Sequence, residues 1–331
     1  MSVLAIDMGY GFTKGLTAHK NTIFRSMVGP AEQIRFESDL HRANGSAIVV
    51  QVGGRRRFVG EYASLQSAST AQTLDPTRTG SEEQLCLFHA AASNLVKTNE
   101  SEIAVVTGLP VADFDDHNKA LLHEMLAGEH LVERHGKRDR HFMVNGVYLV
   151  PQAVGALFAL ILDRNGQIVD GDLAGGRVGI IDVGTLTTNF VLVDRLRYIE
   201  TGSDSITSGM SEVLTKVAKD LKREHGLDWT LNLDRVDEAT RARSVEVYGE
   251  SKSIDYLVDA YTGDLADTVI ARASSLWGSG VDLRAVLLTG GGAHSLAPYV
   301  RRKYPHTRTG DDPQWDNVTG YLRAGLRRFE Q

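Results

Sequence analysis

A repeated motif most constrains how this chain can fold: a short apolar run ends in an aspartate, and a glycine turn follows at once. The two copies are Ile6-Asp7-Met8-Gly9-Tyr10-Gly11 and Ile181-Asp182-Val183-Gly184. Apolar runs bounded by glycine predict buried strands that enter hairpins. Glycine lets backbone N–H groups approach an anion that a Cβ would keep away. Either copy could be an ordinary hairpin turn, but the pair predicts two phosphate-facing hairpins, one per domain, that close on the same triphosphate.

The side chains beside these turns suit magnesium and phosphate. Asp7 and Asp182 can each hold Mg²⁺ through its water shell. Lys14, shortly after the first turn, supplies a point charge for a phosphate group. An exposed lysine on a plain hairpin is the simpler alternative for Lys14.

Two further motifs lie on either side of the second hairpin. A buried strand at 285–288 is expected to end in Gly290-Gly291-Gly292, and this bare backbone can receive a flat base and ribose. Gln152 follows Pro151 at an expected helix start, where a glutamine can orient water without a shifted pKa. Taken alone, the glycines fit a flexible loop and Gln152 fits a capping or surface residue.

Composition narrows the class of protein. The 331 residues suffice for roughly two domains of about 150 residues each. The net charge of −6 argues against a surface that coats DNA broadly. A single cysteine, Cys86, cannot form an internal disulfide, which suits a reducing cytoplasm. No apolar run approaches the roughly 18 residues of a membrane span. We therefore expect a cytoplasmic α/β protein without a membrane partner.

Local patterns predict alternating strands and helices. Ser81-Glu82-Glu83-Gln84 has the spacing of a capping box and is expected to open a helix. The apolar spacing after Ser208 predicts a helix that Gly226 stops. A glycine turn at 53–54 predicts a hairpin over 48–59. Helices are expected at 81–97, 116–126, 151–162, 208–225, 229–282 (mostly helical) and 320–329.

The order of the four motifs resembles the ATPase superfamily of actin, the sugar kinases and the seventy-kilodalton heat-shock chaperones. Within it, the chain is similar to the bacterial and archaeal actin-like proteins of the ParM/StbA type. Smaller elements carry that similarity: Phe24–Val28, Phe58–Ala63 and the Thr-Gly-Leu-Pro turn at 107–110. The resemblance implies an α/β, ribonuclease H-like fold of mixed sheets flanked by helices, with nucleotide in the interdomain cleft. It implies one domain over 1–165 and 310–331 and another over 166–309.

The resemblance also implies roles for matching positions. Asp7 and Asp182 would hold the water shell of Mg²⁺, and Gln152 would position the attacking water. Relatives of the ParM type often carry glutamate at that position, whereas eukaryotic actins carry glutamine. Glu212 and Lys216 would border the adenine, although their spacing equally fits an i,i+4 salt pair. The complete set implied to contact ATP or ADP is Gly9, Gly11, Phe12, Thr13, Lys14, Gly184, Thr185, Thr187, Gly209, Glu212, Lys216, Gly290, Gly291, Gly292 and His294.

Fold and nucleotide binding do not by themselves fix a function. The resemblance implies an ATPase that forms nucleotide-dependent head-to-tail filaments, in the manner of plasmid segregation, and that reaches DNA through an adaptor protein. A non-polymerising regulatory ATPase is the main alternative. A small-molecule kinase is a weaker one, because Gln152 cannot deprotonate a substrate hydroxyl. The aspartates at 113, 115 and 116 fit a solvated acidic turn better than a catalytic base.

Overall fold

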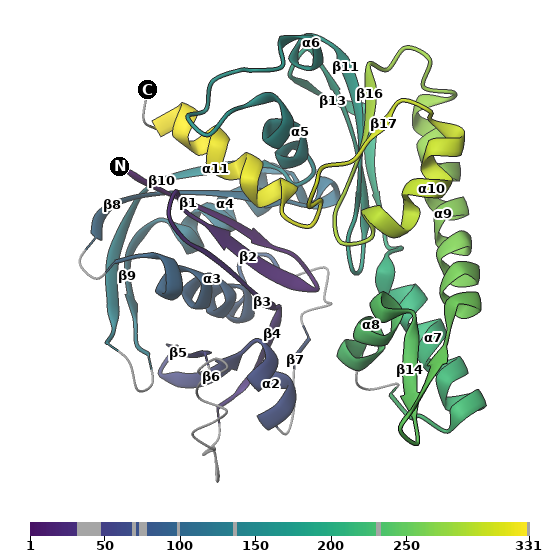
Figure 1. Ribbon diagram of the computed structural model, residues 1–331. Helices are drawn as coiled ribbons and strands as arrows, with labels where there is room; N and C mark the ends of the chain where they lie inside the picture. Colours follow the sequence, from purple (N-terminus) through teal and green to yellow (C-terminus); the bar gives the residue numbers. More distant parts are fainter. Residues whose placement is uncertain are drawn as a thin grey trace. The chain divides into compact units, whose positions relative to one another are not determined.

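The computed structural model describes residues 1–31, 48–67, 71–72, 78–97, 100–134, 138–229 and 233–329. The chain forms two compact units, which we call unit 1 (Met1–Gly171 with Trp315–Gln331) and unit 2 (Asp172–Gln314). Figure 1 shows both units as sheets flanked by helices. The domain boundaries expected at 165/166 and 309/310 stay a prediction.

Unit 1 is built on a six-stranded sheet with the order β3-β2-β1-β8-β10-β9. The central strand β1 is antiparallel to β2 and parallel to β8. Alternate residues of β1 face opposite sides of the sheet: Leu4 and Ile6 pack with α3, whereas Val3 and Ala5 pack with α11. The strands are β1 (Ser2–Met8), β2 (Phe12–Leu16), β3 (Asn21–Arg25), β8 (Glu100–Leu109), β9 (Gly128–Val132) and β10 (Arg140–Pro151).

Helices and a smaller sheet complete unit 1. The expected hairpin at 48–59 is confirmed as β5 (Ile48–Val52) and β6 (Arg55–Val59). Its two turn glycines both have positive φ, as a tight hairpin turn requires. The other elements are β4 (Met27–Pro30), α2 (Glu61–Gln66), β7 (Ala71–Gln72), α3 (Glu82–Leu95), the 3₁₀ turn η1 (Val111–Asp113), α4 (Asp116–Leu126), α5 (Val154–Ile161) and α11 (Asp316–Phe329).

Unit 2 repeats the same strand arrangement in a five-stranded sheet, ordered β13-β12-β11-β16-β17. Strand β11 is antiparallel to β12 and parallel to β16, as β1 is to β2 and β8 in unit 1. The two Asp-Gly motifs therefore occupy equivalent positions in two similar sheets. The elements are α6 (Gly171–Ala174), β11 (Arg177–Val183), β12 (Thr188–Asp194), β13 (Arg197–Ile206), α7 (Met210–His225), α8 (Leu233–Ala242), β14 (Ser244–Val247), β15 (Glu250–Ser253), α9 (Asp255–Trp277), β16 (Ala285–Thr289), α10 (Ala293–Lys303) and β17 (Thr307–Arg308).

Capping signals located several helix ends correctly. The Ser81 side chain accepts a hydrogen bond from the Gln84 N–H at 3.2 Å, so α3 begins where its capping box predicted. Helix α4 has the expected bounds, and α7 ends at His225 before Gly226, whose φ is 70°. Among the described residues, none of the helices combines the length and hydrophobicity needed to cross a bilayer.

One predicted helix start was wrong, and one stretch predicted to be mostly helical also contains a hairpin. The helix expected from Pro151 begins at Val154, and Pro151 instead ends β10, opposite Leu109 of β8. Proline is tolerated there because Pro151 is the last residue of the strand, and the next N–H, that of Gln152, still donates to the Leu109 carbonyl at 2.8 Å. The stretch 229–282 is mostly helical, as expected, but the β14–β15 hairpin separates its helices α8 and α9. Tyr248 and Gly249 form its turn with positive φ, and a two-residue turn of this kind favours strand pairing over helix.

A buried histidine pair lies in the core of unit 1. His89 Nε2 is 3.1 Å from His130 Nδ1, and His130 Nε2 donates to the Leu126 carbonyl at 2.9 Å. The rings of Phe88 and Phe142 pack around the pair. Burial, together with the neighbouring His130, lowers the pKa of His89 to about 3, and burial also lowers the pKa of His130. Both imidazoles are therefore neutral at pH 7.

We expect this pair to make the protein less stable in mild acid. Each histidine has a lower pKa in the folded protein than in the unfolded chain, where the pKa is about 6.5. Just below pH 6.5 the unfolded chain therefore binds protons that the folded protein does not, so the contribution of the pair to stability is present in full only above that pH. That contribution is lost as the pH falls from about 6.5 toward the lowered pKa values, by up to about 1.4 kcal/mol per pH unit for each group. Urea unfolding at pH 7 and pH 5 should show the loss. H89Q should reduce it, whereas H19Q, at an exposed position, should leave it unchanged.

Candidate functional site

The first Asp-Gly hairpin joins β1 to β2 and places an ion pair across them. Asp7 lies opposite Lys14 in the antiparallel register. Lys14 Nζ is 2.6 Å from Asp7 Oδ2, and the two residues are only 9% and 3% exposed. A buried carboxylate is costly unless it is paired and hydrogen-bonded. Lys14 supplies that pairing from β2, the strand that follows the turn.

Gln152 joins this pair from a distant part of the chain. It lies in the turn between β10 and α5, and its Nε2 donates to Asp7 Oδ1 at 3.1 Å. A carboxylate can only accept, so the amide must present its NH₂ to Asp7. The carbonyl oxygen Oε1 is then the side-chain atom left to accept a hydrogen bond. The structure thus brings together Asp7 and Lys14 of the first motif and Gln152 of another motif, three of the predicted site residues.

The turn itself is held by hydrogen bonds that the sequence did not reveal. A Cβ on Gly9 would lie 2.9 Å from the Phe12 carbonyl oxygen, so the turn accepts only glycine there. The Ser26 hydroxyl donates to the Gly9 carbonyl at 2.6 Å, and the backbone N–H of Ser26 donates to the Gly11 carbonyl at 3.0 Å. The buried Thr13 hydroxyl is 2.9 Å from the Ser26 hydroxyl. Thr13 therefore braces the hairpin through Ser26.

The second hairpin, in unit 2, is packed against the start of α7. The Gly184 N–H donates to the Thr187 carbonyl at 2.9 Å and closes the turn. Met210 and Ser211, the first residues of α7, donate to the carbonyls of Gly184 and Thr185. A Cβ on Gly209 would lie 2.6 Å from the Thr185 oxygen. This close approach explains why glycine precedes the helix.

The triple glycine meets the end of β11 beside the same hairpin. Gly290 has φ 86°, and a Cβ there would lie 2.5 Å from the Val183 oxygen and would overlap the Asp182 carboxylate. The Gly292 N–H donates to the Val183 carbonyl at 3.0 Å. A Cβ on Gly291 would meet nothing within 4 Å. Asp182 is 4% exposed. Unit 2 thus gathers Asp182, the hairpin turn and the glycine loop into one site.

Comparison with protein families identifies both halves of this arrangement. The family model of the actin-like proteins N-terminal domain matches residues 5–155, which contain the first hairpin and Gln152. The model of the archaeal actin homologue MreB-like C-terminal domain matches residues 180–302, which contain the second hairpin and the glycine loop. The chain belongs to the actin-like proteins. No curated protein sequence matches it significantly.

Solved structures share the actin-like fold over nearly the whole chain. A 15-stranded ParM filament from Clostridium botulinum is 24% identical, with a TM-score of 0.80 over 98% of this chain and 99% of that one. A non-polymerisable quadruple mutant of pCBH ParM is 23% identical, with the same TM-score and coverage. Ta0583, an archaeal actin homolog solved with ADP, is 20% identical, with a TM-score of 0.80 over 99% and 100% of the two chains.

The predicted adenine residues of the actin-like chain lie on α7. Lys216 pairs with Asp264 of α9, with Nζ 2.9 Å from Oδ2, and lies 5.3 Å from the Tyr261 ring centroid. Lys216 therefore forms its ion pair with Asp264, and not the i,i+4 pair with Glu212 that the spacing also allowed. Glu212 is exposed in the first turn of α7, and His294 is exposed in the first turn of α10. The Phe12 ring is covered by the Arg25 guanidinium at 4.2 Å.

Arg78 is a residue of the site that sequence patterns missed. Its guanidinium donates to the Met8 carbonyl and, at 3.3 Å, to the Gly9 carbonyl, and it lies 4.1 Å from the Tyr10 ring centroid. Burial lowers the pKa of Arg78, while Tyr10, Asp7 and Asp113 act in the opposite direction. Its position in a polar stretch before α3 gave no periodic or motif signal. A buried arginine that binds two turn carbonyls fixes the shape of the first hairpin.

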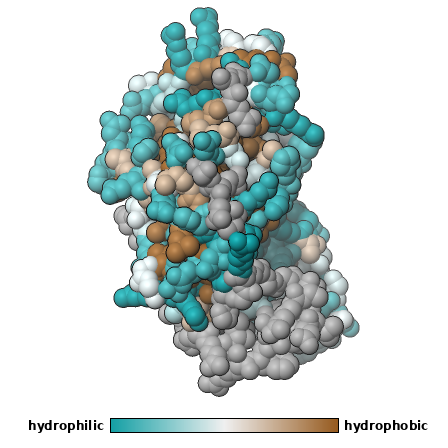
Figure 2. Space-filling model, turned by 90° about the vertical axis from the view of Figure 1, so that its left-hand side faces the viewer, coloured by the Kyte–Doolittle hydropathy of each residue, from teal (hydrophilic) through white to brown (hydrophobic). Residues whose placement is uncertain are grey.

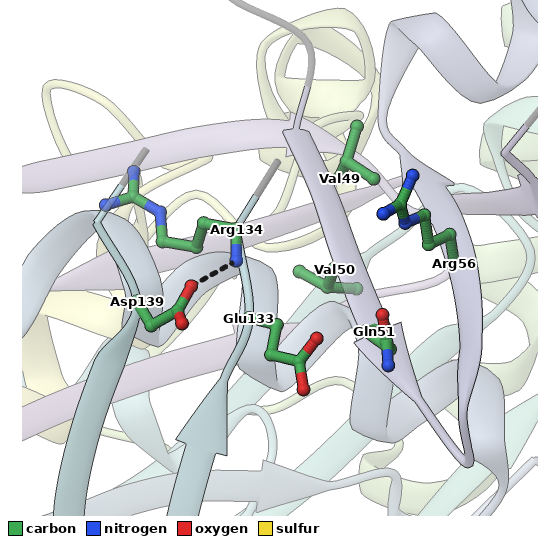
Figure 3. A pocket seen from close by; sticks show the side chains of 7 residues that line it. All are labelled: Val49, Val50, Gln51, Arg56, Glu133, Arg134 and Asp139. Atoms are coloured by element: carbon green, nitrogen blue, oxygen red, sulfur yellow. Dashed lines mark hydrogen bonds between the residues drawn. The ribbon is translucent and has the colours of Figure 1, made fainter. Parts of the chain in front are cut away.

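A polar hollow in unit 1 shares no residue with this site (Figure 3). It has a volume of about 180 Å³ and lies where the β5–β6 hairpin meets the segment after β9. Val50 and Arg134 form a backbone bridge there, and the Arg134 N–H donates to Asp139 at 3.1 Å. Its arginines and acids alternate rather than converge on one charge. The hollow therefore lies along the contact between the β5–β6 and β9–β10 hairpins. The candidate site is the one at the Asp-Gly turns.

Proposed function

We propose that this actin-like chain binds ATP with Mg²⁺, hydrolyses the ATP, and assembles with further copies of itself into filaments. The observation that carries the proposal is the contact of Gln152 and Lys14 with one buried carboxylate, Asp7, beside a glycine turn. The ADP complex of the archaeal actin homolog and the ParM filament support nucleotide binding and self-association.

The donor set fits a magnesium nucleotide. Among the described residues, no cluster of three or more His, Cys, Asp or Glu side chains is placed to hold a metal by itself. Asp7 and Asp182 are single carboxylates beside glycine turns, so each would bind the water shell of Mg²⁺. Bound Mg²⁺ would neutralise charge on the β- and γ-phosphates.

The chain's own residues would supply binding and water positioning. In unit 1 the backbone of Gly9 and Gly11, with Lys14, would bind the β-phosphate, and in unit 2 Gly184, Thr185 and Thr187 would bind the γ-phosphate. Gly209, Gly290, Gly291 and Gly292, with Glu212, Lys216 and His294, would hold the rest of the nucleotide. Gln152 would accept a hydrogen bond from the attacking water through Oε1. A glutamine cannot remove the proton, so its role is orientation.

The proposal of filament assembly rests on the family and not on a large exposed hydrophobic patch among the described residues. The exposed large hydrophobic side chains of the described residues lie mostly on different elements, such as Leu65, Leu131, Tyr248 and Val281. On the face drawn in Figure 2, hydrophobic patches are small and are separated by hydrophilic side chains. A head-to-tail contact would be heterologous and non-closing, which produces fibres. The net charge of −6 favours DNA segregation through an adaptor rather than by direct coating.

We expect assembly above a threshold concentration with ATP and Mg²⁺, followed by disassembly as ATP is consumed. Nucleotide held by both hairpins should reduce the conformational entropy that a subunit loses on joining a filament. Light scattering and sedimentation in ATP, ADP and a slowly hydrolysed analogue, with phosphate release followed in parallel, test this. Weaker assembly in ADP is expected. Phosphate release from a protein that stays monomeric in all three nucleotides would favour the regulatory ATPase. Absence of phosphate release would contradict the proposal.

A further inference from the structure

We propose that the hydroxyl of Tyr321, on the C-terminal helix α11, is a positioning group for hydrolysis, because it fixes the backbone that carries Gln152. This inference rests on the proposed function. Tyr321 lies 169 residues from Gln152 in the sequence, and its hydroxyl donates to the Gln152 carbonyl at 2.7 Å. The C-terminal helix would thereby be part of the catalytic arrangement of unit 1.

Gln152 lies in a turn, where regular helix bonds do not hold it. Its N–H donates to the Leu109 carbonyl at 2.8 Å, and its carbonyl accepts from the Gly155 N–H at 3.3 Å as well as from Tyr321. Within the described part of the chain, the bond from the Tyr321 hydroxyl is the shorter of the two bonds to that carbonyl and the one that comes from outside the turn. It therefore fixes the peptide plane from which the Gln152 side chain reaches Asp7.

Tyr321 is itself buried and closely packed. It is 0% exposed and packs with Val106, Val150 and Val318. A Cβ on Gly108 would lie 2.8 Å from its Cζ atom, and a Cβ on Gly155 would lie 2.6 Å from its Cε1 atom. The two glycines thus leave a slot that fits the ring closely. Removing only the hydroxyl should leave the ring in place, because its walls are unchanged.

The orientation of Gln152 should matter more for the chemical step than for binding. Its side chain would contact the attacking water, and water positioning acts chiefly in the transition state. A displacement of 1 Å in a positioning group can cost about a hundredfold in rate. Y321F removes one of the two described hydrogen bonds to the Gln152 carbonyl and should displace Gln152 by less than 1 Å. We therefore expect Y321F to lower kcat roughly tenfold.

The test compares Y321F with Y304F in the full-length protein. Tyr304 of unit 2 is an apt control, because it is also fully buried and its hydroxyl also donates to a backbone carbonyl, that of Gly278 at 3.2 Å. Both variants lose a buried hydrogen bond and should lose similar stability. Y321F should lower kcat for ATP with little change in KM, whereas Y304F should keep the wild-type kcat. Equal kcat values for Y321F and Y304F would overturn the inference.

Two further measurements separate positioning from a general loss of stability. In the Q152A background, Y321F should lower kcat no further, because the two residues act as a unit. Without nucleotide, the side-chain amide NMR signals of Gln152, assigned by their loss in Q152A, should shift in Y321F and not in Y304F. An additive loss of kcat, or unshifted signals, would contradict the role of Tyr321. A wild-type protein that does not hydrolyse ATP would refute the proposed function itself, and the inference with it.

Discussion

G320A is expected to lower the free energy of unfolding by at least about 3 kcal/mol, near the top of the range for overpacking a core. Gly320 lies inside α11 where this helix crosses α5. A Cβ there would overlap the Gly155 carbonyl oxygen, and it would lie 2.6 Å from the Gly155 carbonyl carbon and 2.9 Å from the Ala159 nitrogen. These are backbone atoms of a helix, which cannot move aside as a flexible side chain can. Urea unfolding followed by circular dichroism measures the loss.

G263A is the matched control, because Gly263 also lies inside a helix, α9. The nearest atom to a Cβ at Gly263 is the Cε1 atom of Tyr299, at an ordinary contact distance of 3.7 Å. Alanine should therefore stabilise the protein there, by about 0.5–1 kcal/mol, through its better helix propensity. A lower free energy of unfolding in G320A and a higher one in G263A would distinguish crowding at the helix crossing from the effect of helix propensity. Similar effects in both variants would contradict the close crossing of α11 and α5.

Features set by neighbouring residues could be predicted from the sequence. The capping spacing at Ser81 and Gln84 gave the start of α3, since a cap depends on residues three apart. The apolar runs that end at Asp7 and Asp182 gave the two hairpins, because burial and glycine turns are local signals. The actin-like fold followed from the order of such motifs and did not require knowledge of any long-range contact.

Features set by distant contacts could not be predicted. Arg78 and Tyr321 reach the site through hydrogen bonds to backbone carbonyls, and no side-chain pattern marks a backbone acceptor. Gln152 was expected at a helix start, but β10 pairs with β8 as far as Pro151 and delays the helix to Val154. The pairing of Lys216 with Asp264, in place of Glu212, likewise depends on how α9 packs against α7.

D182N is expected to remove most of the stabilisation that ATP with Mg²⁺ gives the folded protein. Asp182 is buried at the end of β11, where Gly290 approaches so closely that a Cβ would overlap its carboxylate. Asparagine keeps that shape but removes the charge that would hold the Mg²⁺ water shell. Loss of a group that supports metal binding commonly weakens affinity 10- to 100-fold. At a nucleotide concentration about 100 times the wild-type Kd, stabilisation should fall from about 2.7 to about 0.4 kcal/mol if the loss is about 100-fold.

The control for D182N is D282N. Asp282 is exposed and pairs with Arg177, at the opposite end of β11 from Asp182. Because D282N removes an aspartate from the same unit without touching the glycine turns, it should keep the full nucleotide-linked stabilisation. Thermal unfolding with ATP and Mg²⁺, and again with EDTA, compares the three proteins. EDTA should bring the wild type close to D182N, since both would then lack the Asp182–Mg²⁺ interaction. If D182N retains the wild-type stabilisation with ATP and Mg²⁺, Asp182 does not hold the metal, and Asp7 alone would have to bind it.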